Sequence, residues 1–112
     1  MSCVFCEIGA GRIPAKVLFQ DDRVLAFHDI APKAPTHILV IPKRHIADLD
    51  SVTDADGSLL GDLLLAAKRA AAAAGLRGGY RVVVNRGTDG GQSVDHLHVH
   101  ILGGRTLGWP PG

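Results

Sequence analysis

The chain has 112 residues, 46% of them apolar and 21% charged, so we expect one folded domain over residues 1–112 and exclude global disorder. Twelve Lys and Arg residues against eleven Asp and Glu residues give a net charge of +1, which argues against nucleic acid and anionic membranes as partners. Apolar runs are far shorter than a bilayer span, and no secretory segment is recognised, so we expect a cytoplasmic protein.

The first half of the chain is predicted to contain a short helical segment and three strands. Residues 3–11 form a short turn or helix that ends at glycine. Residues 16–20 and 24–28 are apolar and form a hairpin around a polar turn. After a loop that contains two prolines, residues 37–41 are a continuous apolar strand that Pro42 stops.

The second half is predicted to contain one long helix, from about residue 55 to residue 74. Thr53 and Asp56 have the spacing of a capping box at its start. Its expected buried stripe consists of Leu60, Leu63, Leu64, Ala67 and Ala71. Strands follow at 80–85 and 96–102, with a glycine-rich loop between them. The element order predicts an α+β fold, an antiparallel five-stranded sheet with one long helix and a short N-terminal helix.

The last predicted strand carries three histidines at alternate positions. Alternation along a strand places His96, His98 and His100 on one face, whereas the apolar residues between them face the core. We expect the imidazoles to form a row on the open face of the sheet. Such a row fits either a zinc site for hydrolysis or nucleotide transfer with an imidazole nucleophile. The glycine-rich loop just before the row favours an anion near it, because glycines let backbone N–H groups approach a phosphate.

Cys3 and Cys6 form a Cys-x-x-Cys motif near the N-terminus. A redox dithiol of the thioredoxin kind belongs to a βαβ unit, which this segment is not. The pair is therefore either two inert thiols or half of a zinc site that needs two further ligands.

Beyond these single features, much of the chain resembles one known family. The segment His96-Leu97-His98-Val99-His100-Ile101-Leu102 matches the signature of the histidine triad (HIT) family. Residues 27–30, 35–43 and 80–85 and the terminal Trp109-Pro110-Pro111-Gly112 are similar to the Hint branch of that family.

The resemblance implies a purine nucleoside phosphoramidase. Such an enzyme hydrolyses the P–N bond of adenosine or guanosine 5′-phosphoramidates and releases the nucleoside monophosphate and an amine. By residue-by-residue carry-over, His98 is the nucleophile and forms a nucleotidyl-histidine intermediate. His100 contacts the phosphate, His37 supports the other ring nitrogen of the nucleophile, and Ser93 lies near the leaving group. Gly91 and Gln92 supply phosphate contacts.

The resemblance also implies a nucleoside pocket, a metal site and a homodimer. Asn85, His28 and Asp29 bind the nucleoside, and apolar walls for the base come from Phe5, Ile8, Phe27 and Ile30. In bacterial relatives with an N-terminal cysteine pair, the equivalents of His45 and His96 complete a structural zinc site with Cys3 and Cys6. No catalytic metal is expected. In Hint relatives the C-terminal tail reaches the active site of the partner subunit, where Trp109 would influence leaving-group preference.

Three other functions compete with this interpretation. A nucleotide-binding scaffold with incidental turnover would have the same pocket. A zinc hydrolase would use His96, His98 and His100 as ligands. A dinucleoside polyphosphate hydrolase belongs to another branch of the family, which has Gln at the position of His100.

Overall fold

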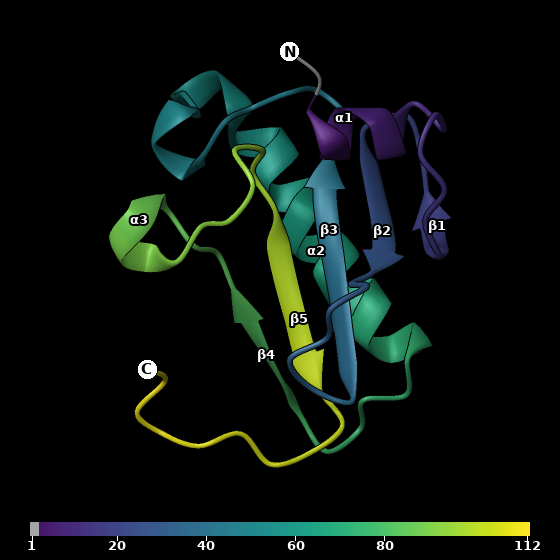
Figure 1. Ribbon diagram of the computed structural model, residues 1–112, viewed down its shortest axis with the longest axis vertical. Coiled ribbons are helices and arrows are strands. Elements are labelled where there is room, and N and C mark those ends of the chain that lie inside the picture. Colours follow the sequence, from purple (N-terminus) through teal and green to yellow (C-terminus); the bar gives the residue numbers. More distant parts are fainter. Residues whose placement is uncertain (1–2) are drawn as a thin grey trace.

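A computed structural model describes residues 3–112, which form a five-stranded antiparallel sheet in the order β1-β2-β3-β5-β4 (Figure 1). The strands are β1 (Val17–Gln20), β2 (Val24–His28), β3 (Thr36–Pro42), β4 (Tyr80–Val83) and β5 (Val99–Gly103). The helices are α1 (Val4–Gly9), α2 (Gly57–Ala73) and α3 (Gly87–Gly90), and short 3-10 turns span Leu49–Ser51 and Asp54–Asp56. The predicted α+β architecture is therefore confirmed.

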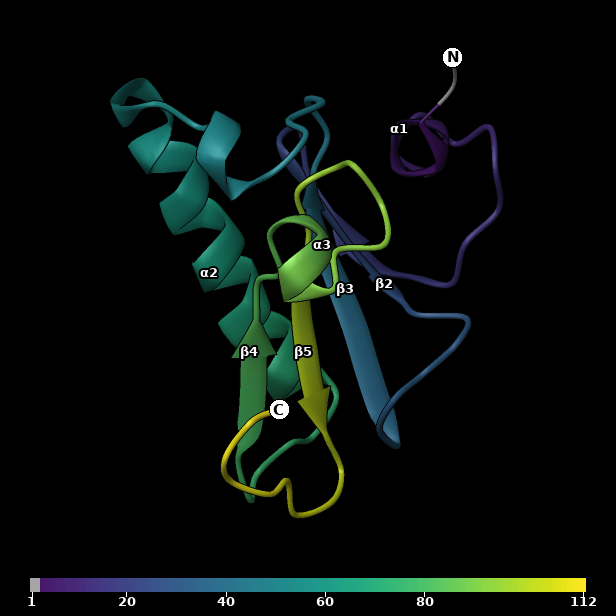
Figure 2. The same ribbon diagram turned by 60° about the vertical axis from the view of Figure 1, so that its left-hand side comes forward.

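The central strand β3 is buried on both of its faces. Ile38 and Val40 pack with α2 in the larger apolar cluster, whereas Leu39 and Ile41 pack with Phe5 of α1 in a smaller one. Figure 2 shows the two helices on opposite sides of the sheet. A strand covered on both faces appears in sequence as a continuous apolar run, which explains the pattern of residues 37–41.

The long helix begins later than expected, and the face that it buries differs from the predicted one. Its capping box is confirmed, since the backbone N–H of Thr53 donates to Asp56 Oδ2 at 2.9 Å, but the first turn is a separate 3-10 turn. The expected stripe is partly wrong, because Leu64 is 57% exposed. The buried residues are Leu59, Leu63, Ala66, Ala67, Ala70 and Ala71. This face includes more of the small alanines, which let a helix approach a sheet closely.

Strand β5 begins at Val99 rather than at the predicted His96. Val40 pairs with Val99 in the β3–β5 ladder, so a longer ladder would place Pro42 opposite Leu97. Pro42 has no N–H to donate, and the Leu97 N–H donates to the carbonyl of Ile46 instead, at 2.7 Å. The ladder therefore stops before the first triad histidine.

Among the described residues, no helix is both long and apolar enough to cross a membrane.

Candidate functional site

The three histidines lie on the same side of the sheet, as the alternation predicted. Leu97, Val99 and Ile101 point the other way and belong to the cluster beneath α2. The expectation of an open face is wrong for two of the rings, because His96 and His98 are buried. Phe5 of α1 covers them, with its ring centroid 5.9 Å from that of His96 and 5.2 Å from that of His98. Helix α1, which contains Cys6 and directly follows Cys3, therefore also forms a wall of the histidine site.

His98 has its two ring nitrogens in different environments. Its Nδ1 lies 2.7 Å from the backbone carbonyl of His96. A carbonyl can only accept, so Nδ1 carries the proton and Nε2 of the neutral ring keeps a lone pair. This Nε2 is the atom that can attack an electrophile. The ring nitrogen of His98 that His37 was expected to support is thus hydrogen-bonded to the His96 carbonyl.

His37 instead orients His100. The backbone N–H of Lys33 donates to His37 Nδ1 at 3.0 Å, so the proton of neutral His37 is on Nε2. That Nε2 lies 2.8 Å from His100 Nδ1 and 3.5 Å from Asp29 Oδ2. Since His37 donates to His100 Nδ1, the proton of neutral His100 is on its Nε2.

The His100 Nε2 atom is a buried donor without a hydrogen-bond partner within residues 3–112. Burial lowers the pKa of His100 to about 4, with smaller contributions in the same direction from the neighbouring His98 and His37. Burial also lowers the pKa of His37. Both rings are therefore neutral at pH 7, and an unpartnered N–H of this kind is suited to bind an anionic oxygen.

A cavity of about 310 Å³ opens beside His98 and His100. It includes nine of the predicted site residues, namely Phe5, Ile8, Phe27, His28, Asp29, Ile30, Ser93, His98 and His100. Sequence reasoning missed its other lining residues, which are Val4, Ile13, Pro14, Ala15, Leu39 and Val94. The apolar residues of the loop after α1 were the available signal, because apolar side chains in a proline-containing loop need a surface to cover.

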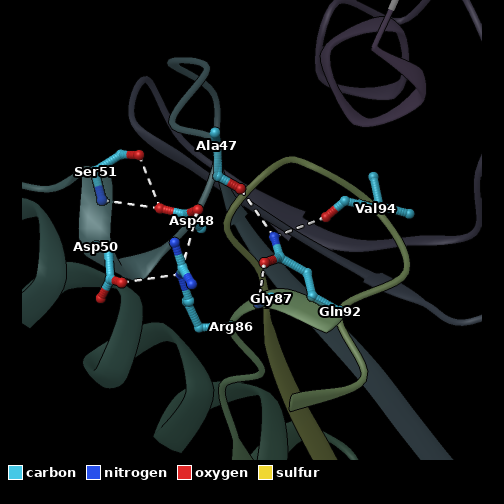
Figure 3. Close-up of polar contacts among 8 residues, drawn as sticks. All are labelled: Ala47, Asp48, Asp50, Ser51, Arg86, Gly87, Gln92 and Val94. Carbon is cyan, nitrogen blue, oxygen red and sulfur yellow. Dashed lines mark hydrogen bonds and ion pairs between the residues drawn. The ribbon is translucent and has the colours of Figure 1, made fainter. Parts of the chain in front are cut away.

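Four predicted nucleotide-binding residues lie outside the lining of this cavity. Asn85 lies close to Gly90 in the loop before the triad, and Gly91 ends the short helix α3 with φ +81°. The Gln92 amide is directed at backbone groups of Gly87, Ala47 and Val94 (Figure 3). Trp109 is 81% exposed and lies against the Arg81 guanidinium.

A second cluster joins Cys3, Cys6, His45 and His96, whose ligand atoms all lie within 4.8 Å of one another. His96 Nδ1 is 3.4 Å from Cys3 Sγ, 3.5 Å from Cys6 Sγ and 3.2 Å from His45 Nδ1. Ligand atoms of a tetrahedral zinc ion lie about 3.3 to 3.8 Å apart, given bonds of about 2.0 to 2.3 Å. The donor set and its spacing therefore fit zinc.

The tautomer of His96 agrees with a metal-binding role. Its Nε2 lies 2.8 Å from the Pro42 carbonyl and must donate to it, so Nδ1 presents a lone pair to the two thiols. The same geometry argues against a zinc ion held by all three triad histidines. His96 Nδ1 faces the cysteines and His98 Nδ1 faces a carbonyl, so the three rings do not direct lone pairs to one point.

The family known as "HIT domain" matches residues 10–107, so the chain belongs to the HIT family. The crystal structure of a HIT family hydrolase from Legionella pneumophila is 54% identical, covers 99% of this chain and 100% of its own, and superposes with a TM-score of 0.96. A histidine triad nucleotide-binding protein from Candida albicans is 35% identical, with coverage of 97% and 83% and a TM-score of 0.83.

A third solved structure bears on the metal cluster. A zinc-bound histidine triad family protein from Mycobacterium smegmatis is 36% identical, with coverage of 94% of this chain and 76% of its own and a TM-score of 0.84. The fold is thus that of HIT family hydrolases, and the spacing of the four cysteine and histidine ligand atoms is one that could hold a metal ion.

Proposed function

We propose that the protein is a purine nucleoside phosphoramidase. The observation that carries this proposal is the pair of tautomers that the hydrogen bonds impose, with a lone pair on His98 Nε2 and an N–H on His100 Nε2. Both rings line the same cavity. A nucleophile beside a donor for a phosphoryl oxygen is the arrangement that nucleotidyl transfer needs. The nucleotide-binding relative from Candida albicans supports the same substrate class.

In the first step, His98 Nε2 attacks the phosphorus of a bound nucleoside phosphoramidate. A bond forms between Nε2 and phosphorus, the P–N bond of the substrate breaks, and the leaving amine takes up one proton from solvent. The imidazole becomes cationic, and its Nδ1–H keeps donating to the His96 carbonyl, which stabilises the charge. His100 Nε2–H donates to a phosphoryl oxygen, and Ser93 lies at the same cavity for the leaving group.

In the second step, water attacks the phosphorus of the nucleotidyl-histidine. The bond from phosphorus to Nε2 breaks, the nucleoside monophosphate is released with one proton lost to solvent, and His98 returns to its neutral form. The apolar walls formed by Phe5, Ile8 and Phe27 suit a purine ring. Asp29 suits the ribose hydroxyls, although its Oδ1 already accepts from the Ala31 N–H at 2.8 Å.

A structural zinc ion belongs to this proposal. Bound by Cys3, Cys6, His45 and His96, it would supply a crosslink between the N-terminal segment and the loops that follow β3 and precede β5, rather than chemistry at the phosphate. A reducing cytoplasm would keep both cysteines available as ligands. The fit of the zinc-bound relative from Mycobacterium smegmatis supports this assignment.

A homodimer is also part of the proposal. Strand β4 lies at an edge of the sheet and exposes Tyr80 and Val82, and α2 exposes Leu64 and Leu65. An edge strand with apolar side chains is a surface that proteins pair or cover. Pairing there would bring Trp109, which is exposed next to Arg81 of β4, close to the partner subunit.

The test is incubation with adenosine 5′-phosphoramidate, with release of AMP followed by chromatography and the protein followed by intact mass. We expect turnover and a transient adduct of one adenylyl group. The His98→Asn variant should bind AMP but form neither product nor adduct. Tight AMP binding by the wild type without turnover would instead identify a nucleotide-binding scaffold. Turnover without any adduct in rapidly quenched samples would contradict a covalent mechanism.

A further inference from the structure

The side chain of Gln92 makes three hydrogen bonds to backbone groups (Figure 3). Its Oε1 accepts from the Gly87 N–H at 3.0 Å, and its Nε2 donates to the carbonyls of Ala47 at 2.9 Å and Val94 at 3.0 Å. A side-chain amide has two donor hydrogens, and here each has a partner. Oxygen Oε1 is an acceptor and cannot bind an anion. The Gln92 side chain is thus fully engaged before any phosphate arrives.

Two of the bonds made by Gln92 close the loop over α3. Its side chain accepts from the Gly87 N–H, and its own backbone N–H donates to the Gly87 carbonyl at 3.0 Å. Gly87 has φ +72°, a left-handed conformation that glycine adopts without strain. Gln92 therefore closes residues 87–92 into a hydrogen-bonded loop, and the chain continues from this loop into Ser93.

The other two hydrogen bonds made by Gln92 attach the end of this loop, next to Ser93, to the rest of the site. Ser93 lies between Gln92 and Val94, and the Gln92 amide holds the carbonyls of both Val94 and Ala47. The residues that lead into β5, Leu97 and His98, are tied to the same segment, because the Leu97 N–H donates to the Ile46 carbonyl at 2.7 Å. Residues 46 and 47 are thus a common anchor for Ser93 and for the nucleophile.

We infer that Gln92 is a positioning residue, which sets Ser93 relative to His98 by attaching the loop to Ala47 and does not itself bind the phosphate. This differs from the phosphate contact that family resemblance implies for Gln92. The kinetic part of the inference rests on the proposed function, because it concerns the placement of a group near the leaving amine.

The kinetic test compares Gln92→Met with Gln20→Met. Methionine has nearly the length of glutamine and forms none of the three bonds, and Gln20 is the other glutamine of the chain, exposed at the end of β1. With adenosine 5′-phosphoramidate, Gln92→Met should lower kcat about 10- to 100-fold, the effect of a small misplacement of reacting groups, and change the Kd for AMP less than about threefold. Gln20→Met should leave both values unchanged. A raised Kd for AMP with unchanged kcat would overturn the inference, because it would assign Gln92 to the phosphate.

A second measurement needs neither turnover nor a stable Gln92→Met variant. In the wild type, NMR should show slow exchange of the Gly87 amide proton and of both Gln92 side-chain amide protons, with little change when AMP is added. Fast exchange of these protons in the free protein, with protection only after AMP binds, would contradict the positioning role of Gln92. Gln92→Asn, one methylene shorter, should lose the protection of Gly87 while the protein stays folded. If the wild type shows slow exchange but no phosphoramidase activity, the proposed function is wrong, whereas the attachment of the loop by Gln92 is confirmed.

Discussion

His37 Nε2 and His100 Nδ1 lie 2.8 Å apart, although 63 residues separate them in the chain. The register of two strands explains this contact. In the β3–β5 ladder Leu39 is opposite His100 and His37 is opposite Leu102, so the two histidines are diagonal neighbours on one face. The contact decides which nitrogen of His100 carries the proton, and in the proposed reaction this N–H donates to a phosphoryl oxygen.

Replacing His37 should therefore slow the reaction through His100. In His37→Phe the ring volume is kept, but His100 Nδ1 loses its donor, so His100 no longer has a fixed proton position. We expect kcat to fall about 10- to 100-fold, within the range of acid–base effects. A double-mutant cycle of His37→Phe with His100→Gln should show strong non-additivity. Additive losses would mean that the two residues act independently.

Acid should destabilise the fold through the same pair. Burial lowers the pKa of His100 to about 4, against an ordinary value of 6.5, although the nearby Asp29 carboxylate acts in the opposite direction. Below pH 6.5 the unfolded chain binds a proton at this ring and the folded chain does not, so the free energy of unfolding decreases as pH falls. The decrease should begin near pH 6.5 and level off below pH 4.

Urea unfolding at pH 5 and at pH 7.5 measures this effect. His100→Gln removes the titrating ring, so its stability should depend less on pH in this window than that of the wild type. An equal pH dependence in the two proteins would assign the acid sensitivity to other groups.

Removal of zinc should weaken nucleotide binding as well as stability. The N-terminal segment that contributes Cys3 and Cys6 also contributes the cavity walls Phe5 and Ile8. Without the crosslink these walls are less firmly held, and loss of one well-buried apolar contact is equivalent to about a tenfold loss in affinity. Chelation should lower Tm and raise the Kd for AMP, and added zinc should restore both. The variant Cys3→Ser/Cys6→Ser should not respond to either treatment. Loss of turnover with unchanged Tm and Kd would instead indicate a catalytic metal.

A charge on the exposed edge of the sheet should prevent dimer formation. Val82 is 39% exposed on β4, and a lysine there would place charge on the surface proposed to pair. Sedimentation should give about twice the chain mass of 11.8 kDa for the wild type and the single-chain mass for Val82→Lys. Val17→Lys is the matched control, because it places the same charge on β1, at the opposite edge of the sheet, where Val17 is 43% exposed, and it should stay dimeric. A wild-type protein that sediments as a single chain would contradict the dimer.

Several features of the fold and site followed from local sequence patterns. The alternation of histidines and apolar residues from His96 to Ile101 determined which residues face the core, because side chains of extended backbone alternate. The Thr53 and Asp56 spacing predicted the capping box, which the structure places at the 3-10 turn that leads into the long helix. Two cysteines three residues apart, with the resemblance to bacterial relatives, predicted the four residues that the structure brings together as a metal cluster.

The tertiary structure alone decided how distant segments meet. The sequence has leucines on two adjacent stripes of α2, and only packing against the sheet selected Leu59 over Leu64. The support of His100 by His37, and the direction of the Gln92 amide toward Ala47, depend on positions of segments that lie 45 or more residues apart. Periodicity reports the environment of a residue relative to its neighbours in sequence. The partner of a hydrogen-bonding atom depends on strand register and loop closure, which the whole chain determines together.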